Sequence, residues 1–150
     1  MKLHFIWVGK TKNKHWRALQ EDYLERLSHF TKYSITVIKD KAAHESIEIE
    51  GKRILEKVNH SSFVCLLDVR GRALDSLKLA REFEKWQIRG IKELTIIIGG
   101  AEGVPSAVVK RADFSLSLSL LTLTHEMARV VLIEQIYRAY TIIKGYPYQK

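Results

Sequence analysis

Five short apolar runs, each separated from the next by a helical pattern, constrain the fold of this chain more than any other feature. The run at residues 94–98 is aliphatic apart from one threonine, which indicates a strand buried on both faces. The other expected strands are residues 3–8, 34–38, 63–67 and 113–120. The expected helices are residues 14–30, 47–58, 74–88 and 124–144, with a further helix beginning near Pro105. Strands that alternate with helices predict an α/β fold with a mostly parallel sheet flanked by helices.

The length of 150 residues fits one domain spanning residues 1–150, and no internal repeat or linker divides it. The single cysteine, Cys65, excludes an internal disulfide framework and fits a reducing compartment. The longest apolar runs fall far short of the roughly 20 residues that span a bilayer. Residues 3–8 lead into a basic loop without the small-residue cleavage site that follows a signal peptide. We therefore expect a cytoplasmic protein with no membrane partner.

Positive charge is concentrated at the start of the chain. The 25 Lys and Arg residues exceed the 17 Asp and Glu residues, which gives a net charge of +8. The first 17 residues contain no acid and five basic residues: Lys2, Lys10, Lys12, Lys14 and Arg17. Such a patch suits phosphates or an anionic partner surface, but it also suits an ordinary solvated face. Charge alone leaves these two interpretations equally open.

The last expected helix is apolar around almost its whole circumference. Between Met127 and Ile143, twelve of seventeen residues are apolar. A domain of this size does not readily enclose a terminal helix, so we expect a partner subunit, most simply a homodimer. Arg129 and Arg138 interrupt the apolar pattern, and buried arginines are costly unless paired. We therefore expect the two arginines either to pair with Glu126, Glu134 or a partner subunit, or to bind a ligand.

Three expected strands end in segments that suit a ligand pocket. These segments are residues 67–71, the glycine-rich residues 99–103 and residues 120–125. In an open parallel sheet, ligands bind outside the carboxyl ends of the strands, so the three segments define one candidate pocket. Neither a dinucleotide fingerprint nor a complete phosphate-binding loop is present, because the first glycine of the latter falls at His4.

Other polar residues give weaker signals. The six histidines are scattered and lack metal-ligand spacing, so we expect no metal site. Cys65 fits an inert core thiol, and His125 at a helix start is more often structural than catalytic. The tail after Gly145 fits a frayed end, but its tyrosines and Lys150 also suit contact with a base and a phosphate.

Four motifs recur in an order that matches a known family. They are Leu67-Asp68-x-x-Gly71, Ile98-Gly99-Gly100-x-x-Gly103, Leu116-Ser117 through Leu121-Thr122-Leu123-x-His125, and Arg129-Val130-x-Leu132-x-Glu134-Gln135-x-Tyr137-Arg138-Ala139. Together with the first ten residues and the Pro147-Tyr148 tail, they resemble the ribosomal RNA large subunit methyltransferase H family. The members of that family are small SPOUT methyltransferases. The resemblance spans the whole chain, and its motifs are specific jointly rather than singly.

The resemblance implies a trefoil-knotted (α/β-knot) domain that works as a homodimer and binds S-adenosylmethionine. It also implies methylation of N3 of a pseudouridine in large-subunit (23S) ribosomal RNA on assembled ribosomes, without a metal. The cofactor residues would be Leu67, Gly99, Leu118, Ser119, Leu120, Leu121, Thr122 and Leu123. Arg138 and Tyr148 would orient the base and stabilise developing charge. RNA phosphates would be held by Lys10, Lys12, Lys14, Arg17 and Lys150.

The chain departs from the family pattern at one position. The family tail usually has His after Pro-Tyr, whereas this chain has Gln149. A glutamine can hydrogen-bond an imide but cannot take its proton near neutral pH. Gln149 supports an alternative hypothesis, a catalytically inactive ribosome-binding assembly factor on the same fold. A third hypothesis is a small-molecule nucleotide enzyme of ordinary doubly wound type. It leaves the basic N-terminus and the apolar last helix unexplained.

Overall fold

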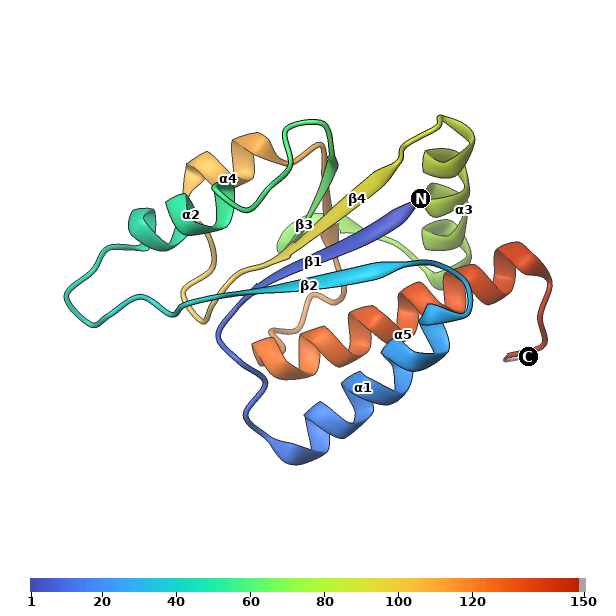
Figure 1. The fold of residues 1–150 in the computed structure, drawn as a ribbon, viewed down its shortest axis with the longest axis horizontal. Helices are drawn as coiled ribbons and strands as arrows, with labels where there is room; N and C mark the ends of the chain where they lie inside the picture. The colour runs from blue at the N-terminus through green and yellow to red at the C-terminus, as the bar shows by residue number, and fades with distance from the viewer. Residues whose placement is uncertain (149–150) are drawn as a thin grey trace.

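A five-stranded parallel sheet forms the centre of the molecule (Figure 1). The computed structural model describes residues 1–148. The strands are β1 (Lys2–Val8), β2 (Tyr33–Ile38), β3 (Phe63–Ala73), β4 (Glu93–Ile98) and β5 (Phe114–Ser117). Their order is β2-β1-β4-β3-β5, and every neighbouring pair is parallel. The predicted α/β fold with a parallel sheet is therefore confirmed, whereas the trefoil knot and the homodimer stay predictions.

Helices cover both faces of the sheet. On one face lie α1 (Lys14–Ser28), α3 (Ser76–Ile88) and α5 (His125–Lys144), and α5 packs against both of the others (Figure 1). The other face carries α2 (Ile47–Leu55) and α4 (Ser106–Arg111). None of the helices within residues 1–148 is both long enough and apolar enough to cross a membrane.

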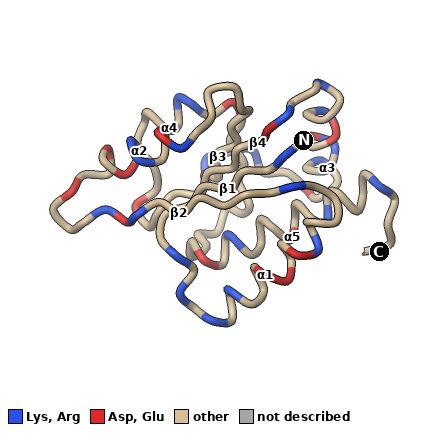
Figure 2. The backbone as a smooth tube through the Cα atoms, viewed as in Figure 1, with Lys and Arg blue, Asp and Glu red and all other residues tan. Residues whose placement is uncertain are grey.

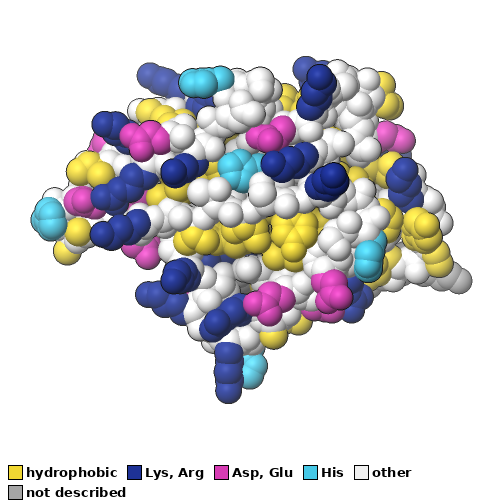
Figure 3. Space-filling model, viewed as in Figure 1, with side chains coloured by type: hydrophobic (Ala, Val, Ile, Leu, Met, Phe, Trp, Pro, Cys, Tyr) yellow, Lys and Arg dark blue, Asp and Glu magenta, His cyan; other side chains and the backbone are white. Residues whose placement is uncertain are grey.

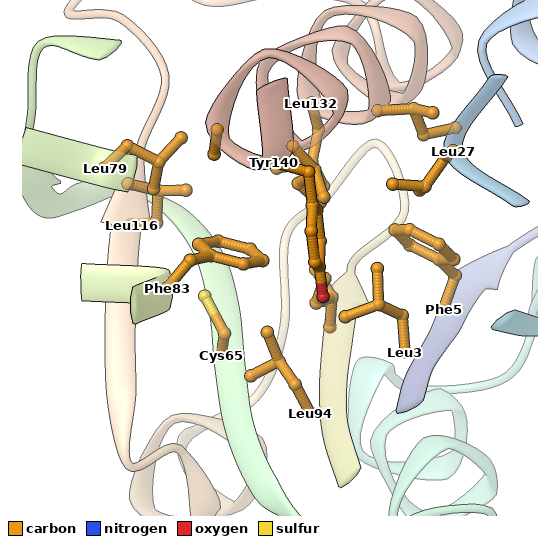
Figure 4. Packing of buried hydrophobic residues seen from close by; sticks show 14 of the residues in the cluster. Leu3, Phe5, Leu27, Cys65, Leu79, Phe83, Leu94, Leu116, Leu132 and Tyr140 are labelled. Carbon is orange, nitrogen blue, oxygen red and sulfur yellow. The ribbon is translucent and has the colours of Figure 1, made fainter. Parts of the chain in front are cut away.

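Alternate strand residues build two cores, because successive side chains of a strand point to opposite faces. In β4, Ile96 and Ile98 join the core under α1, α3 and α5, while Ile97 joins the core under α2 and α4. All three are at most 4% exposed, so the expected burial of this strand on both faces is confirmed. Figure 4 shows Phe83 and Phe5 on either side of Tyr140 in the larger core.

Local signals start the helices within two residues of their expected first positions. The Asn13 side chain accepts backbone N–H groups of α1, and the Asp75 side chain does the same for α3. Thr124 caps the start of α5, and Gly145 ends that helix with a φ of 68°, a left-handed conformation that favours glycine. Pro105 lies immediately before α4.

Two strands differ from the sequence prediction by more than one residue. β5 ends at Ser117 rather than at residue 120, because Ser117 donates to the carbonyl of Ser119 at 3.1 Å and forms a local turn. β3 continues to Ala73 rather than ending at residue 67, because the chain leaves the ladder and then returns to it. Both differences occur where three strand ends meet, and they shape the site described next.

Candidate functional site

A cavity of about 740 Å³ opens at the carboxyl ends of β3, β4 and β5. Its volume lies in the range of small-molecule sites. We call it the strand-end cavity. Its walls come from three segments, residues 67–70, 98–104 and 118–124, and from the first turn of α5. The three segments that the sequence singled out are thus adjacent in space.

The first wall is a detour of β3. Leu67 and Arg72 both pair with Leu116 of β5, so the residues between them project out of the ladder. Gly71 allows the return to β5, because a Cβ atom there would lie 2.7 Å from the carbonyl carbon of Ser115. Within the detour, Asp68 and Arg70 form an ion pair at 2.8 Å. The Arg70 side chain lowers the pKa of the Asp68 carboxyl below its usual value, which keeps the carboxylate ionised at neutral pH.

The second wall is a tight turn after β4. The N–H of Gly103 donates to the carbonyl of Gly100 at 3.0 Å and folds the loop back on itself. Gly99 permits this close approach, because a Cβ atom there would lie 2.7 Å from Val104 Cγ1 and 2.9 Å from the Gly103 carbonyl oxygen. Glu102 of this loop forms an ion pair with Lys41 at 3.4 Å.

The third wall follows β5, where Ser119 shapes the loop by accepting the N–H of Leu121 at 2.9 Å. Leu120 is 89% exposed and is not part of the lining. The other residues expected to bind the cofactor all line the cavity: Leu67, Gly99, Leu118, Ser119, Leu121, Thr122 and Leu123.

The first turn of α5 connects this cavity to the basic loop, residues 9–13 between β1 and α1. His125 and Ala128 face the cavity. Glu126 accepts the backbone N–H groups of Lys12 and Asn13. One rigid helical turn therefore contacts both the candidate cofactor pocket and the loop with the candidate phosphate ligands.

Arg129 is the buried anchor of this connection. Its side chain is fully buried and donates to the Val8 carbonyl and, at 2.9 Å, to the Thr11 hydroxyl. Its guanidinium lies 5.1 Å from the centre of the Trp7 ring. Burial lowers the pKa of Arg129 to about 10, so the side chain stays charged at neutral pH. Within residues 1–148, the hydrogen-bond partners of Arg129 are thus a carbonyl of β1 and a hydroxyl of the basic loop, rather than Glu126 or Glu134 as the sequence suggested.

The expected RNA-binding residues lie outside the cavity. Lys10, Lys12, Lys14 and Arg17 are exposed around the basic loop and the start of α1 (Figure 2). The guanidinium of Arg17 donates to the Lys12 carbonyl at 3.4 Å. Lys150 lies outside the described residues, as does Gln149.

The two expected catalytic residues meet at Glu134. The Glu134 carboxylate accepts hydrogen bonds from Arg138 and, at 3.1 Å, from the Tyr148 hydroxyl. The Tyr148 hydroxyl also lies 3.2 Å from that of Tyr23, and the Arg138 guanidinium lies 4.9 Å from the centre of the Tyr148 ring. We call these four residues the Glu134 cluster. Burial, with added effects of Tyr23 and Glu134, raises the pKa of Tyr148 well above its usual range. Its hydroxyl therefore acts as a hydrogen-bond donor rather than as a base.

The Glu134 cluster and the strand-end cavity are separate within one chain. Arg138 follows Ala128, the last cavity residue of α5, by ten positions, which is about 15 Å along a helix axis. The structure thus brings Arg138 and Tyr148 together but not into contact with the expected cofactor residues.

Some side chains of the site were not predicted from the sequence. Glu134 was named only as a possible partner of an arginine, although its spacing of four from Arg138 is a known helical pairing signal. Neither the contact of Tyr23 with Tyr148 nor the pairing of Lys41 with Glu102 has a sequence signal. Within residues 1–148, no three His, Cys, Asp or Glu side chains lie close enough together to hold a metal ion.

Comparison with known proteins identifies the family. Residues 1–149 match the family model described as predicted SPOUT methyltransferase. The chain is 40% identical to proteins named "Ribosomal RNA large subunit methyltransferase H" from Streptococcus pneumoniae strains CGSP14 and JJA. Each alignment spans 159 positions and covers 100% of both chains. The chain therefore belongs to the SPOUT methyltransferases and, among them, to the ribosomal RNA large subunit methyltransferase H family.

Proposed function

We propose that this chain catalyses S-adenosylmethionine-dependent methylation of N3 of a pseudouridine in large-subunit (23S) ribosomal RNA. The names of its relatives support an activity on large-subunit ribosomal RNA. The observation that carries the proposal is the strand-end cavity. It is lined by seven of the eight residues that the family resemblance assigns to the cofactor.

The residues of the cavity fit S-adenosylmethionine. Leu67, Leu118 and Leu123 offer apolar surface for an adenine, and the folded loop at residues 99–103 brings backbone close to it. The carboxylates of Asp68 and Glu102 suit the cationic parts of the cofactor. When bound there, S-adenosylmethionine supplies an electrophilic methyl group, so the chain has to position a nucleophile in line with it.

The distance between the cavity and the Glu134 cluster supports a homodimer. The outward side of α5 carries Met127, Val131 and Ile142, and Ile142 is 38% exposed. Two copies of α5 that pack antiparallel along this side would bury it in a self-complementary interface. The same packing would bring Arg138 and Tyr148 of each subunit toward the cavity of the other. Each active site would then be shared between two chains.

In this arrangement, the chain's residues act on the target base rather than on the cofactor. Arg138 stabilises the negative charge that develops when the imide loses its proton. The Tyr148 hydroxyl donates a hydrogen bond that orients the base, since its raised pKa keeps it protonated. Neither Tyr148 nor Gln149 accepts the proton, so water takes it. Lys10, Lys12, Lys14 and Arg17 hold phosphates of the same RNA. The trefoil knot, the ribosome as substrate and a cytoplasmic location complete the proposal.

A second candidate function is a ribosome-binding assembly factor that binds the cofactor without transferring the methyl group. Gln149 favours it, because the family has a histidine there. The doubly wound small-molecule enzyme has no such support, since the chain belongs to a family of methyltransferases.

Methyl transfer to ribosomes separates these functions. Labelled S-adenosylmethionine is incubated with ribosomes that lack the modification, together with either the wild type or the Gln149→His variant. We expect stoichiometric incorporation by the wild type at a pseudouridine of the large-subunit RNA. If only the variant is active, Gln149 has disabled the site. If neither is active and both bind the cofactor, the assembly-factor function replaces the enzyme.

A further inference from the structure

A second cavity lies at the far end of α5 and shares no residue with the first. It measures about 790 Å³ and opens between the last turns of α1 and α5 and the segment after α5. We call it the helix-end cavity. Its lining consists of Arg26, His29, Phe30, Tyr137, Thr141, Lys144, Tyr146, Pro147 and Tyr148. In Figure 3, hydrophobic side chains and one histidine lie at this end of the molecule.

The lining combines cations with aromatic rings. Its two cations are Arg26 and Lys144, His29 adds an imidazole, and none of the nine lining residues is Asp or Glu. Arg26 forms an ion pair at 3.1 Å with Asp22, which is not part of the lining, and the Arg26 side chain stays 47% exposed. The cavity therefore offers positive charge to a ligand.

The rings are held in place by the chain itself. The Tyr146 N–H donates to the Thr141 carbonyl at 2.9 Å, which turns the chain back after Gly145. Tyr146 then meets Phe30 edge-on at 5.7 Å between ring centres, and Phe30 meets Tyr137 in the same way at 5.8 Å. Tyr146 nevertheless stays 62% exposed, which is unusual for a ring that only fills a core. A preformed aromatic surface is thus presented to a ligand.

We propose that the helix-end cavity is a subsite for a nucleotide next to the target base in a single-stranded RNA segment. The base stacks on Tyr146, and the phosphate is held by Lys144 and Arg26. Stacking on aromatic rings beside cations is the common way in which proteins hold unpaired RNA. Tyr148 belongs both to this lining and to the Glu134 cluster, so the subsite adjoins the place proposed for the target base. The inference rests on the proposed function, since it takes RNA as the substrate.

Variants with matched controls test the subsite. Lys144→Glu removes a lysine from the last turn of α5, and Lys110→Glu does the same in the last turn of α4, on the other face of the sheet. Tyr146→Ala removes the ring and Tyr146→Phe keeps it, while Ile88→Ala truncates another exposed apolar side chain. Affinity for ribosomes is measured at several salt concentrations, together with cofactor affinity, kcat and KM.

We expect Lys144→Glu to weaken ribosome binding about tenfold and to lower the salt dependence by about one ion. Tyr146→Ala should weaken binding between about 5-fold and 100-fold, whereas Tyr146→Phe binds like the wild type. KM for ribosomes should rise accordingly, with kcat and cofactor affinity unchanged. The Lys110→Glu and Ile88→Ala controls should match the wild type.

The binding measurement separates this inference from the proposed reaction. If the wild type transfers no methyl group but its binding shows the expected sensitivities, the subsite stands and the reaction fails. If the wild type methylates ribosomes and Lys144→Glu and Tyr146→Ala behave like their controls, the subsite is wrong. A wild type that neither methylates nor binds ribosomes overturns both.

Discussion

The two ends of α5 are built in different ways. Its first turn is held by Arg129, which is fully buried and bonds to the Val8 carbonyl, and by Glu126, which accepts backbone N–H groups. Its second half carries Arg138, whose partners Glu134 and Tyr148 are themselves side chains that are only partly buried. Backbone partners fix the first end in one position. Arg138, in contrast, can exchange its side-chain partners for groups of a ligand. In the proposed function, this difference would make the first turn of α5 a preformed cofactor end and its second half an adaptable RNA end.

The largest effect is expected from Arg138→Ala. If this side chain stabilises the anion of the deprotonated target base, kcat should fall about 100-fold to 1,000-fold. This is the usual effect of removing a hydrogen-bond donor to a developing charge. Cofactor affinity should stay unchanged, because Arg138 does not line the strand-end cavity. Single-turnover methyl transfer and cofactor titration check both values. A loss of cofactor affinity equal to the loss of kcat would contradict the claim that the two ends of α5 have separate roles.

Arg129→Met should act on stability rather than on the chemical step. It leaves the buried carbonyl of Val8 and the hydroxyl of Thr11 without their donor, which costs about 2–4 kcal/mol of the free energy of unfolding. Urea unfolding measures this loss, and Arg129→Lys should recover part of it. A variant as stable as the wild type would show that the first turn of α5 needs no such anchor.

Gly71→Ala should disturb the detour of β3. The added Cβ would lie 2.7 Å from backbone of β5, so the strand must shift, at a cost of about 1–3 kcal/mol. Because Leu67 and Asp68 move with it, cofactor affinity should fall together with stability. Gly90→Ala is a useful control, because the left-handed φ of 76° at Gly90 makes that change cost stability as well, while Gly90 does not line the strand-end cavity. Unchanged cofactor affinity in Gly71→Ala would place the detour outside the binding site.

The smallest effect is expected from Tyr148→Phe, at about 1 kcal/mol of stability for one hydrogen bond. The pKa of Tyr148 is raised in the folded state, so the unfolded chain loses this proton first as the pH rises above about 10. The wild type should therefore lose stability above that pH, and Tyr148→Phe should lose less. Urea unfolding at neutral and alkaline pH measures the difference. Equal losses in both proteins would contradict the raised pKa.

The sequence predicted those features that follow from hydrophobic periodicity and from the geometry of a parallel sheet. The aliphatic run at residues 94–98 implied a central strand, and the segments after β3, β4 and β5 were found because parallel strands end at one edge. The anchoring of Arg129 could not be predicted, because its partners are a backbone carbonyl and a hydroxyl more than 100 positions away. The early end of β5 depends on the Ser117 hydroxyl turning to the backbone, which strand periodicity does not report.

Mixed dimers test the central claim, that each active site combines the cavity of one subunit with Arg138 of the other. Arg138→Ala impairs the RNA end, and Gly99→Val disrupts the cofactor loop through its contacts with Val104 and Gly103. Each variant alone should be nearly inactive. In a mixed dimer, one site would combine an intact cavity with an intact Arg138, so random mixing should restore about a quarter of wild-type activity. No recovery in dimers shown to be mixed would contradict the shared site and place the whole reaction within one chain.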